Sequence, residues 1–273
     1  MISVEHLTKC YGDFTAVDDL SFEIGEGHVY GFLGPNGAGK STTMNIMTGC
    51  LSATAGHVRI DGYDIFDEPD KAKKLIGYLP EHPPLYMNET PLEYLTFVGE
   101  AKGLRGEELN RQIDTVIGLT KIEHMKHRRI SALSKGYQQR VGIAQALLGN
   151  PKVIILDEPT AMLDPNGRRE VIRTIHELNR AEGITVLLIT HYMDEAIAAN
   201  RVVVMDKGNI LMDGTPKEIF SQVDLLKEHH LDVPQSTELI HRLKEAGCMG
   251  LPNGVLTEDE CVAALKLLLK EQA

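Results

Sequence analysis

One glycine-rich stretch constrains the fold of this chain more than any other feature. Residues 34–42 read GPNGAGKST, which matches the spacing G-x-x-x-x-G-K-[ST] at Gly34, Gly39, Lys40 and Ser41. An apolar stretch, HVYGFLG, leads into it, and a helix-like stretch, STTMNIMTG, overlaps its end and continues beyond it. Glycines let consecutive backbone N–H groups curl around an anion, and the following helix directs its positive dipole end at the same point. The stretch predicts a phosphate-binding loop between a strand and a helix rather than a plain glycine-rich turn.

The side chains of this loop indicate a nucleoside triphosphate as the ligand. Lys40 can reach the β- and γ-phosphates, and the Ser41 hydroxyl can bind Mg²⁺. We expect the whole loop to contact the nucleotide, through Gly34, Pro35, Asn36, Gly37, Ala38, Gly39, Lys40, Ser41 and Thr42.

A second stretch, VIILDEPT at 153–160, predicts hydrolysis of that nucleotide. Its four apolar residues read as a buried strand that ends in Asp157 and Glu158. At this point Asp157 can hold Mg²⁺ through water, and Glu158 can accept a proton from an attacking water. A helix cap or a surface acidic pair is the alternative, which the phosphate loop makes less favourable.

The order of elements predicts an α/β fold. Residues 1–63 contain short turn-bounded strands, and about 91–148 follow a helical pattern. From 153 to 220, buried strands alternate with helices, the strands at 153–157, 184–190 and 202–206 and the helices at 167–181 and 193–198. This alternation predicts a parallel sheet covered on both faces.

The last fifty residues predict a small helical appendage. A helix near 236–246 carries Leu239, Ile240 and Leu243 on one face. In the next helix, Thr257 and Glu260 have the spacing of a capping box. An apolar stripe is expected on that helix at Val262, Leu265 and Leu269.

Composition excludes several classes of protein. Of 273 residues, 42% are hydrophobic and 25% charged, as in a soluble globular protein. A net charge of −11 argues against broad binding to nucleic acid. The apolar runs are of strand length, far short of the roughly 20 residues of a membrane helix. The first residues show no basic stretch followed by an apolar core, so we expect no signal peptide. The cysteines have no metal-like or C-x-x-C spacing, so we expect reduced thiols at Cys10, Cys50, Cys248 and Cys261.

The stretch LSKGYQQR at 133–140 has two readings. Ser134 precedes a predicted helix at 136–148, and a serine there often does no more than cap the helix. The same geometry, a hydroxyl and a glycine at a helix N-terminus, also suits an anion. On these residues alone both readings stay open.

Taken together, the motifs resemble those of the ATP-binding cassette (ABC) ATPases, the nucleotide-binding subunits of ABC transporters. The resemblance rests on the phosphate loop, VIILDEPT, LSKGYQQR, AMLDP at 161–165 and TH at 190–191, in this order and spacing. It covers residues 1–220 and implies the P-loop NTPase fold of that family, with a β-rich N-terminal subdomain and an inserted helical subdomain at about 90–150. Residues 221–273 would be the appendage.

The resemblance also implies an activity and partners. The chain is expected to bind ATP and Mg²⁺ and to hydrolyse ATP on the cytoplasmic face of a membrane, bound to a transmembrane subunit. Two cassettes, identical or paralogous, would pair head to tail, so that Ser134 and Gly136 of one contact the γ-phosphate held by the other. The family signature reads Leu-Ser-Gly-Gly-Gln, from which Lys135 and Tyr137 depart, and no contact is predicted for Tyr137.

Four further roles carry over from the family. Tyr11 occupies the position that stacks on adenine, although a core or edge-strand tyrosine is the alternative. His191 matches the switch histidine that contacts the γ-phosphate, which makes it catalytic together with Glu158 and Lys40; a lone histidine is more often structural. Asp164 matches the loop that crosses the dimer interface. Glu81 stands where the family usually has glutamine, so it keeps an oxygen ligand for Mg²⁺ beside Ser41 and Asp157 but adds negative charge.

The two parts of the chain resemble different branches of the family. YGFLGPNGAGKST and LSKGYQQRVGIAQAL are similar to cassettes of ABC-2-type exporters and the gliding-related group. From about Gly167 the chain is similar to cassettes of energy-coupling factor transporters, in which C-terminal helices help the cassettes pair. A mosaic with a junction near 164–167 is one hypothesis, and the direction of transport stays open. The other functions considered are a soluble ABC ATPase acting on DNA or ribosomes, and a regulatory module without hydrolysis.

Overall fold

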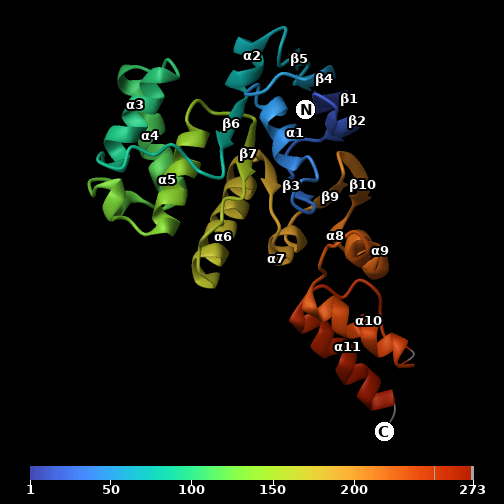
Figure 1. Ribbon diagram of the computed structural model, residues 1–273. Helices are drawn as coiled ribbons and strands as arrows, with labels where there is room; N and C mark the ends of the chain where they lie inside the picture. Colours follow the sequence, from blue (N-terminus) through green and yellow to red (C-terminus); the bar gives the residue numbers. More distant parts are fainter. Residues whose placement is uncertain (249, 272–273) are drawn as a thin grey trace.

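The larger of two β-sheets carries the strands that the motifs predicted. The computed structural model describes residues 1–248 and 250–271 (Figure 1). The larger sheet has the order β10-β9-β3-β8-β7-β6, in which β10 is antiparallel and the other five strands run parallel. Its strands are β3 (Val29–Leu33), β6 (Ile76–Leu79), β7 (Val153–Asp157), β8 (Thr185–Ile189), β9 (Arg201–Asp206) and β10 (Asn209–Gly214). The predicted parallel sheet is confirmed.

Both faces of this sheet are covered, since its central strands β3, β7 and β8 are buried at every position. Ile154 and Leu156 of β7 face a core shared with helices, while Val153 and Ile155 face a second core. The second core lies between the large sheet, α1 (Lys40–Met47) and the smaller sheet. Continuous burial of this kind is characteristic of parallel strands between two layers.

The smaller sheet is antiparallel and forms the β-rich N-terminal part. Its order is β2-β1-β4-β5. The strands are β1 (Ile2–Tyr11), β2 (Phe14–Ile24), β4 (Ala55–Ile60) and β5 (Tyr63–Asp64), followed by α2 (Pro69–Lys74). The rings of Phe22 in β2 and Phe32 in β3 lie 5.3 Å apart, which joins the two sheets through the core.

A group of three helices follows β6. These are α3 (Pro91–Ala101), α4 (Gly106–Thr120) and α5 (Lys135–Leu147), with short 3₁₀ helices at Glu123–Met125 and Ile130–Ala132. Thr90 and Glu93 form a capping box at the start of α3. This group, at the left of Figure 1, is the predicted inserted helical region.

The C-terminal helices divide between two cores. They are α6 (Pro165–Glu182), α7 (Met193–Ile197), α8 (Pro216–Phe220), α9 (Val223–Glu228), α10 (Gln235–Glu245) and α11 (Glu258–Glu271). Leu226 of α9 and the following Leu231 and Val233 belong to the main core. In contrast, α10 and α11 pack on each other around a small core of their own and extend away from the sheets (Figure 1). The division of the chain near residue 220 stays a prediction.

The predicted apolar stripe on the last helix is wrong in part. The capping box is present, because Glu260 N–H donates to Thr257 Oγ1 at 3.2 Å and Thr257 N–H donates to the Glu260 carboxylate at 3.2 Å. The helix then turns a different face inward, formed by Cys261, Ala264, Leu265 and Leu268. Val262 and Leu269 are exposed, as is Leu239 on α10.

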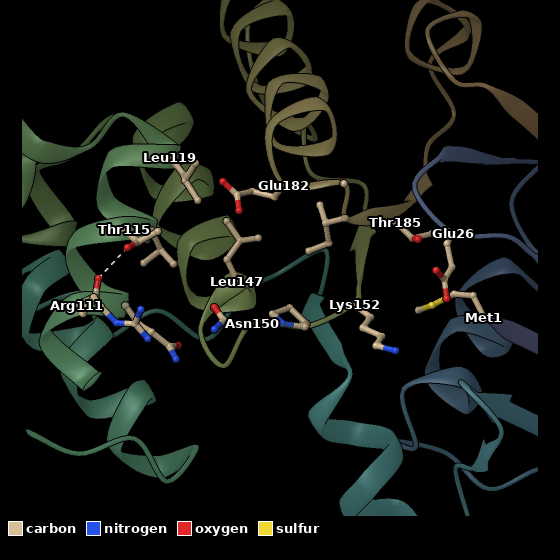
Figure 2. Close-up of a pocket in the computed structure, with 15 residues that line it drawn as sticks. Met1, Glu26, Arg111, Thr115, Leu119, Leu147, Asn150, Lys152, Glu182 and Thr185 are labelled. Atoms are coloured by element: carbon tan, nitrogen blue, oxygen red, sulfur yellow. Dashed lines mark hydrogen bonds between the residues drawn. The ribbon is translucent and has the colours of Figure 1, made fainter. Parts of the chain in front are cut away.

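No described helix combines the length and apolar character needed to cross a lipid bilayer. A cleft of about 460 Å³ lies where β7 and β8 begin, between them and α4 (Figure 2). It is lined by polar groups such as Arg111, Lys152 and Glu182 and contains none of the predicted site residues.

Candidate functional site

Two glycines allow the phosphate loop to pass through a crowded part of the fold. The loop connects β3 to α1, as predicted. A Cβ atom on Gly34 would lie 2.3 Å from the Met205 carbonyl oxygen, and one on Gly39 would lie 2.6 Å from the Ala16 carbonyl oxygen. Gly39 also has a φ of 96°. Only glycine fits at these two positions.

Lys40 is held inside the loop. Its ammonium donates to the carbonyl oxygen of Gly34 at 2.7 Å and to that of Pro35 at 3.0 Å. The side chain is buried, and this burial lowers the pKa of Lys40 despite the opposing effect of Glu158 and Asp157. A positive charge is therefore fixed where the phosphates of a nucleotide would lie.

The carboxylates predicted to hold a metal are close to one another. Asp157 ends β7 and is buried. Burial, reinforced by the negative charges of Glu158 and Glu81, raises the pKa of Asp157 to about 6. Ser41 and Glu81 line the cleft beside the phosphate loop. Carboxylates that repel one another in this way, together with a hydroxyl oxygen, fit a hard divalent cation such as Mg²⁺.

Glu158 and His191 lie close together at the carboxyl ends of β7 and β8. The His191 Nδ1 atom lies 3.2 Å from a carboxylate oxygen of Glu158. Glu158 has a φ of 46°, a conformation that non-glycine residues seldom adopt. Such backbone strain is often stored where a side chain must be aimed at a ligand.

A buried carboxylate, which the sequence analysis missed, holds the loop that carries His191. Glu195 accepts a hydrogen bond from the hydroxyl of Thr190 at 2.7 Å and is hydrogen-bonded to the hydroxyl of Thr160 through its other oxygen. Burial raises the pKa of Glu195. Thr160 belongs to the segment after Glu158, so Glu195 ties the two segments together. The sequence signal for this link was the threonine that follows each of the two strands, Thr160 after β7 and Thr190 after β8.

One cleft of about 750 Å³ unites most of the predicted residues. The phosphate loop, Tyr11, Glu81, Glu158 and His191 all line it. Tyr11 is not a core residue, because its side chain is 49% exposed, and the ammonium of Lys9 lies over its ring, 5.2 Å from the centroid. The cleft also has lining residues that the sequence analysis missed, among them Phe14, Met193, His230, Leu231 and Asp232.

Four predicted residues do not line this cleft: Asp157, which is buried beside Glu158, and three residues that lie apart from it. Ser134, Gly136 and Asp164 line a separate hollow of about 270 Å³. Ser134 does cap its helix, since its hydroxyl accepts a hydrogen bond from Tyr137 N–H at 3.4 Å. Met162, on the rim of the hollow, is 75% exposed. One chain therefore does not bring these three residues to its own phosphate loop.

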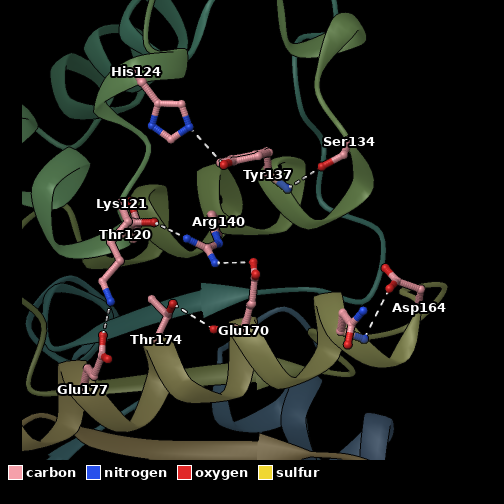
Figure 3. Close-up of polar contacts among 11 residues, drawn as sticks. Thr120, Lys121, His124, Ser134, Tyr137, Arg140, Asp164, Glu170, Thr174 and Glu177 are labelled. Carbon is pink, nitrogen blue, oxygen red and sulfur yellow. Dashed lines mark hydrogen bonds and ion pairs between the residues drawn. The ribbon is translucent and has the colours of Figure 1, made fainter.

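Tyr137 has a definite set of contacts, although it departs from the family signature. Its hydroxyl is hydrogen-bonded to His124 Nε2 at 2.9 Å, and the guanidinium of Arg140 lies 5.6 Å from its ring centroid. Arg140 also donates to Glu170 of α6 at 3.0 Å (Figure 3). A second ion pair, Lys121 with Glu177 at 2.6 Å, crosses the same boundary. These contacts connect the helical region to α6.

Comparison with known proteins identifies this arrangement. The family model described as ABC transporter matches residues 17–161, the part that contains the phosphate loop, LSKGYQQR and β7. This chain belongs to the ABC transporter family. Its ATP-binding cassette binds ATP and hydrolyses it to drive transport, with a membrane subunit as partner.

Three relatives show how far the similarity of this ABC cassette extends. The energy-coupling factor transporter ATP-binding protein EcfA1 of Clostridium novyi is 44% identical, over 92% of this chain and 90% of that protein. The structure of cbiO1 from Clostridium perfringens superposes with a TM-score of 0.76 at 31% identity, over 89% of this chain and 98% of that one. A dimeric ATP-binding cassette, MJ0796, bound to ADP and Pi gives a TM-score of 0.71 at 29% identity, over 79% of this chain and 99% of that one.

Proposed function

We propose that ATP is hydrolysed in the cleft of about 750 Å³ and that each cleft is completed by a second cassette. The observation that carries this proposal is the separation of the site within one chain. Lys40, Glu158 and His191 share the cleft, whereas Ser134, Gly136 and Asp164 lie in a hollow apart from it. In a head-to-tail pair, the hollow of one cassette closes over the cleft of the other. This arrangement brings the two sets of residues together in one site.

The residues of the cleft divide the chemistry among them. Glu158 accepts the proton of the attacking water, and His191, 3.2 Å away, orients that carboxylate and contacts the γ-phosphate. Lys40 and the backbone N–H groups of the loop hold the phosphates. Ser41, Asp157 and Glu81 would hold Mg²⁺, which would neutralise charge on the phosphate oxygens. Tyr11 stacks on the base.

The transporter is of the energy-coupling factor type in this proposal, which the similarity to EcfA1 supports. The apolar residues exposed on α10 and α11 support a role in pairing of the cassettes; they are Leu239, Val262, Leu267 and Leu269. The pair binds its transmembrane subunit at the inner face of the membrane. A net charge of −11 does not favour nucleic acid as a partner.

The decisive experiment traps the pair. In a Glu158→Gln background with Mg²⁺ and ATP, light scattering of the full chain, with any copurifying second cassette, should show a dimer. Ser134→Arg should abolish this dimer without changing ATP binding to the single chain, because its own cleft is intact. The proposal fails if ATP-bound Glu158→Gln chains stay monomeric with the second cassette present, or if Ser134→Arg leaves the dimer unchanged.

A further inference from the structure

The cleft has two ends, and the order of the strands in the larger sheet indicates which residues lie at each end. The phosphate loop follows β3, in the middle of the sheet. Glu81, Glu158 and His191 follow β6, β7 and β8, which all lie on one side of β3. On the other side lies β9, followed by a turn in which Gly208 N–H donates to the carbonyl oxygen of Ala38 in the phosphate loop at 3.0 Å. Glu81 and Glu158 thus lie at one end of the cleft.

The end beside β9 is where the aromatic side chains lie. Gly208 also contacts β2, since its carbonyl oxygen accepts a hydrogen bond from Asp18 N–H at 3.1 Å. The same strand begins at Phe14, which pairs with Tyr11 across the β1–β2 turn. Both rings are exposed to the cleft, so this is the end that suits a nucleoside.

A segment far away in the sequence forms a wall at this end. His230, Leu231 and Asp232, between α9 and α10, line the cleft. The preceding His229 has its Nδ1 atom 2.7 Å from a carboxylate oxygen of Asp206, the last residue of β9. This pair fixes the segment on the β9 side of the phosphate loop, away from Glu158.

The segment is rigid enough to recognise a ligand. Leu231 is buried in the main core, and its N–H donates to the carbonyl oxygen of Leu226 at 2.9 Å. His230, with a φ of 59°, and Asp232 flank this anchor and are both exposed. The anchored backbone therefore places an imidazole and a carboxylate on the lining of the cleft at its nucleoside end.

We propose that Asp232 is a specificity-determining residue that accepts a hydrogen bond from the nucleoside of bound ATP, with His230 on the same wall. Two groups of adenosine can donate to it, the amino group of the base and the ribose hydroxyls. A carboxylate gains nothing from the negatively charged phosphates, so its favourable contact is with the nucleoside. The inference rests on the proposed place of the base beside Tyr11.

The test compares three ligands on the full chain. They are the non-hydrolysable imido analogue of ATP, inorganic tripolyphosphate, and ADP. Asp232→Asn should weaken binding of both nucleotides about 3- to 10-fold, because the amide oxygen of Asn still accepts a hydrogen bond but without the negative charge that strengthens it. Binding of tripolyphosphate should not weaken. Glu228→Gln, which removes the same charge from an exposed position on α9 outside the cleft, should change none of the three affinities.

Three further nucleotides identify the donor. If a ribose hydroxyl donates, 2′-deoxy-ATP or 3′-deoxy-ATP should bind parent and Asp232→Asn equally; if the amino group donates, purine riboside triphosphate should do so. The inference is overturned if Asp232→Asn leaves nucleotide affinity unchanged at an unaltered melting temperature, or weakens tripolyphosphate equally. Tyr11→Ala serves as a separate test of the base position: unchanged nucleotide affinity there would refute stacking on Tyr11 and leave the result for Asp232 standing.

Discussion

At the scale of single residues, the site works by placing like charges against one another. Asp157, Glu158 and Glu81 repel, and the fold holds them together through buried strands and through the Lys40 ammonium. Such crowding destabilises the protein on its own account and is found where a ligand neutralises the charge. The same side chains therefore lower the stability of the fold and serve its function.

The general base can be tested by an isosteric change. Glu158→Gln removes the proton acceptor but keeps the shape of the side chain. We expect ATP turnover to fall by about 10²- to 10⁴-fold, the usual contribution of a positioned base, while affinity for ATP is kept. Steady-state phosphate release gives the rate. Glu107→Gln, on the exposed side of α4, is the matched control. Turnover at the parental rate would show that another group takes the proton.

Asp157 predicts how stability changes with pH. Its pKa is raised from 3.8 to about 6 in the folded protein, so the fold disfavours the ionised form. The free energy of unfolding should therefore decrease as pH rises from about 4 to about 6, and stay reduced above that. Asp157→Asn should be more stable than the parent at pH 7, by on the order of 1 to 3 kcal/mol, and this gain should shrink towards pH 4. Urea titrations in chelator check this; an equal difference at both pH values would contradict it.

At the scale of elements, the phosphate loop depends on close approach of three backbone segments. Gly39→Ala would bring a Cβ atom against the Ala16 carbonyl, in a left-handed backbone. We expect a loss of about 1 to 3 kcal/mol in the free energy of unfolding, together with loss of ATP binding. Thermal unfolding and nucleotide titration measure the two effects.

Gly62→Ala supplies the control for this change. Gly62 has a similar φ of 87°, but a Cβ atom there would meet nothing within 4 Å. Its substitution should show the backbone strain alone and leave ATP affinity unchanged. If both variants lost the same stability and bound ATP equally, the contact with Ala16 would have no importance.

At the scale of the whole molecule, the exposed apolar face of α10 and α11 should contribute to pairing of the cassettes but not to the stability of the single chain. Leu267 is 63% exposed, whereas Ala264 lies in the small core of α10 and α11. Leu267→Glu should change the free energy of unfolding by less than about 0.5 kcal/mol but weaken pairing of the cassettes, measured by sedimentation. Ala264→Glu should instead unfold this helix pair. Unchanged pairing in Leu267→Glu would remove this face from the interface.

Much of this molecule could be predicted from the sequence because its signals are local. Short stretches of no more than ten residues are enough to predict the phosphate loop, β7 and the helix after Ser134. The parallel sheet follows from the order of these elements. His230 and Asp232 could not be found in this way, because only the tertiary pairing of His229 with Asp206 brings them to the cleft. The inward face of α11 was predicted only at Leu265, since leucines cover more than one side of that helix and packing against α10 selects among them.

The hollow around Ser134 has a pharmacological consequence. At about 270 Å³ it is near the lower limit for a drug-like ligand, and it is physically distinct from the cleft proposed to hold ATP. In the proposed pair of cassettes, a compound that filled it would block pairing and so stop turnover, while each chain stayed free to take up nucleotide. Such inhibition would not be overcome by raising the ATP concentration, unlike that of any compound that competes for the phosphate loop.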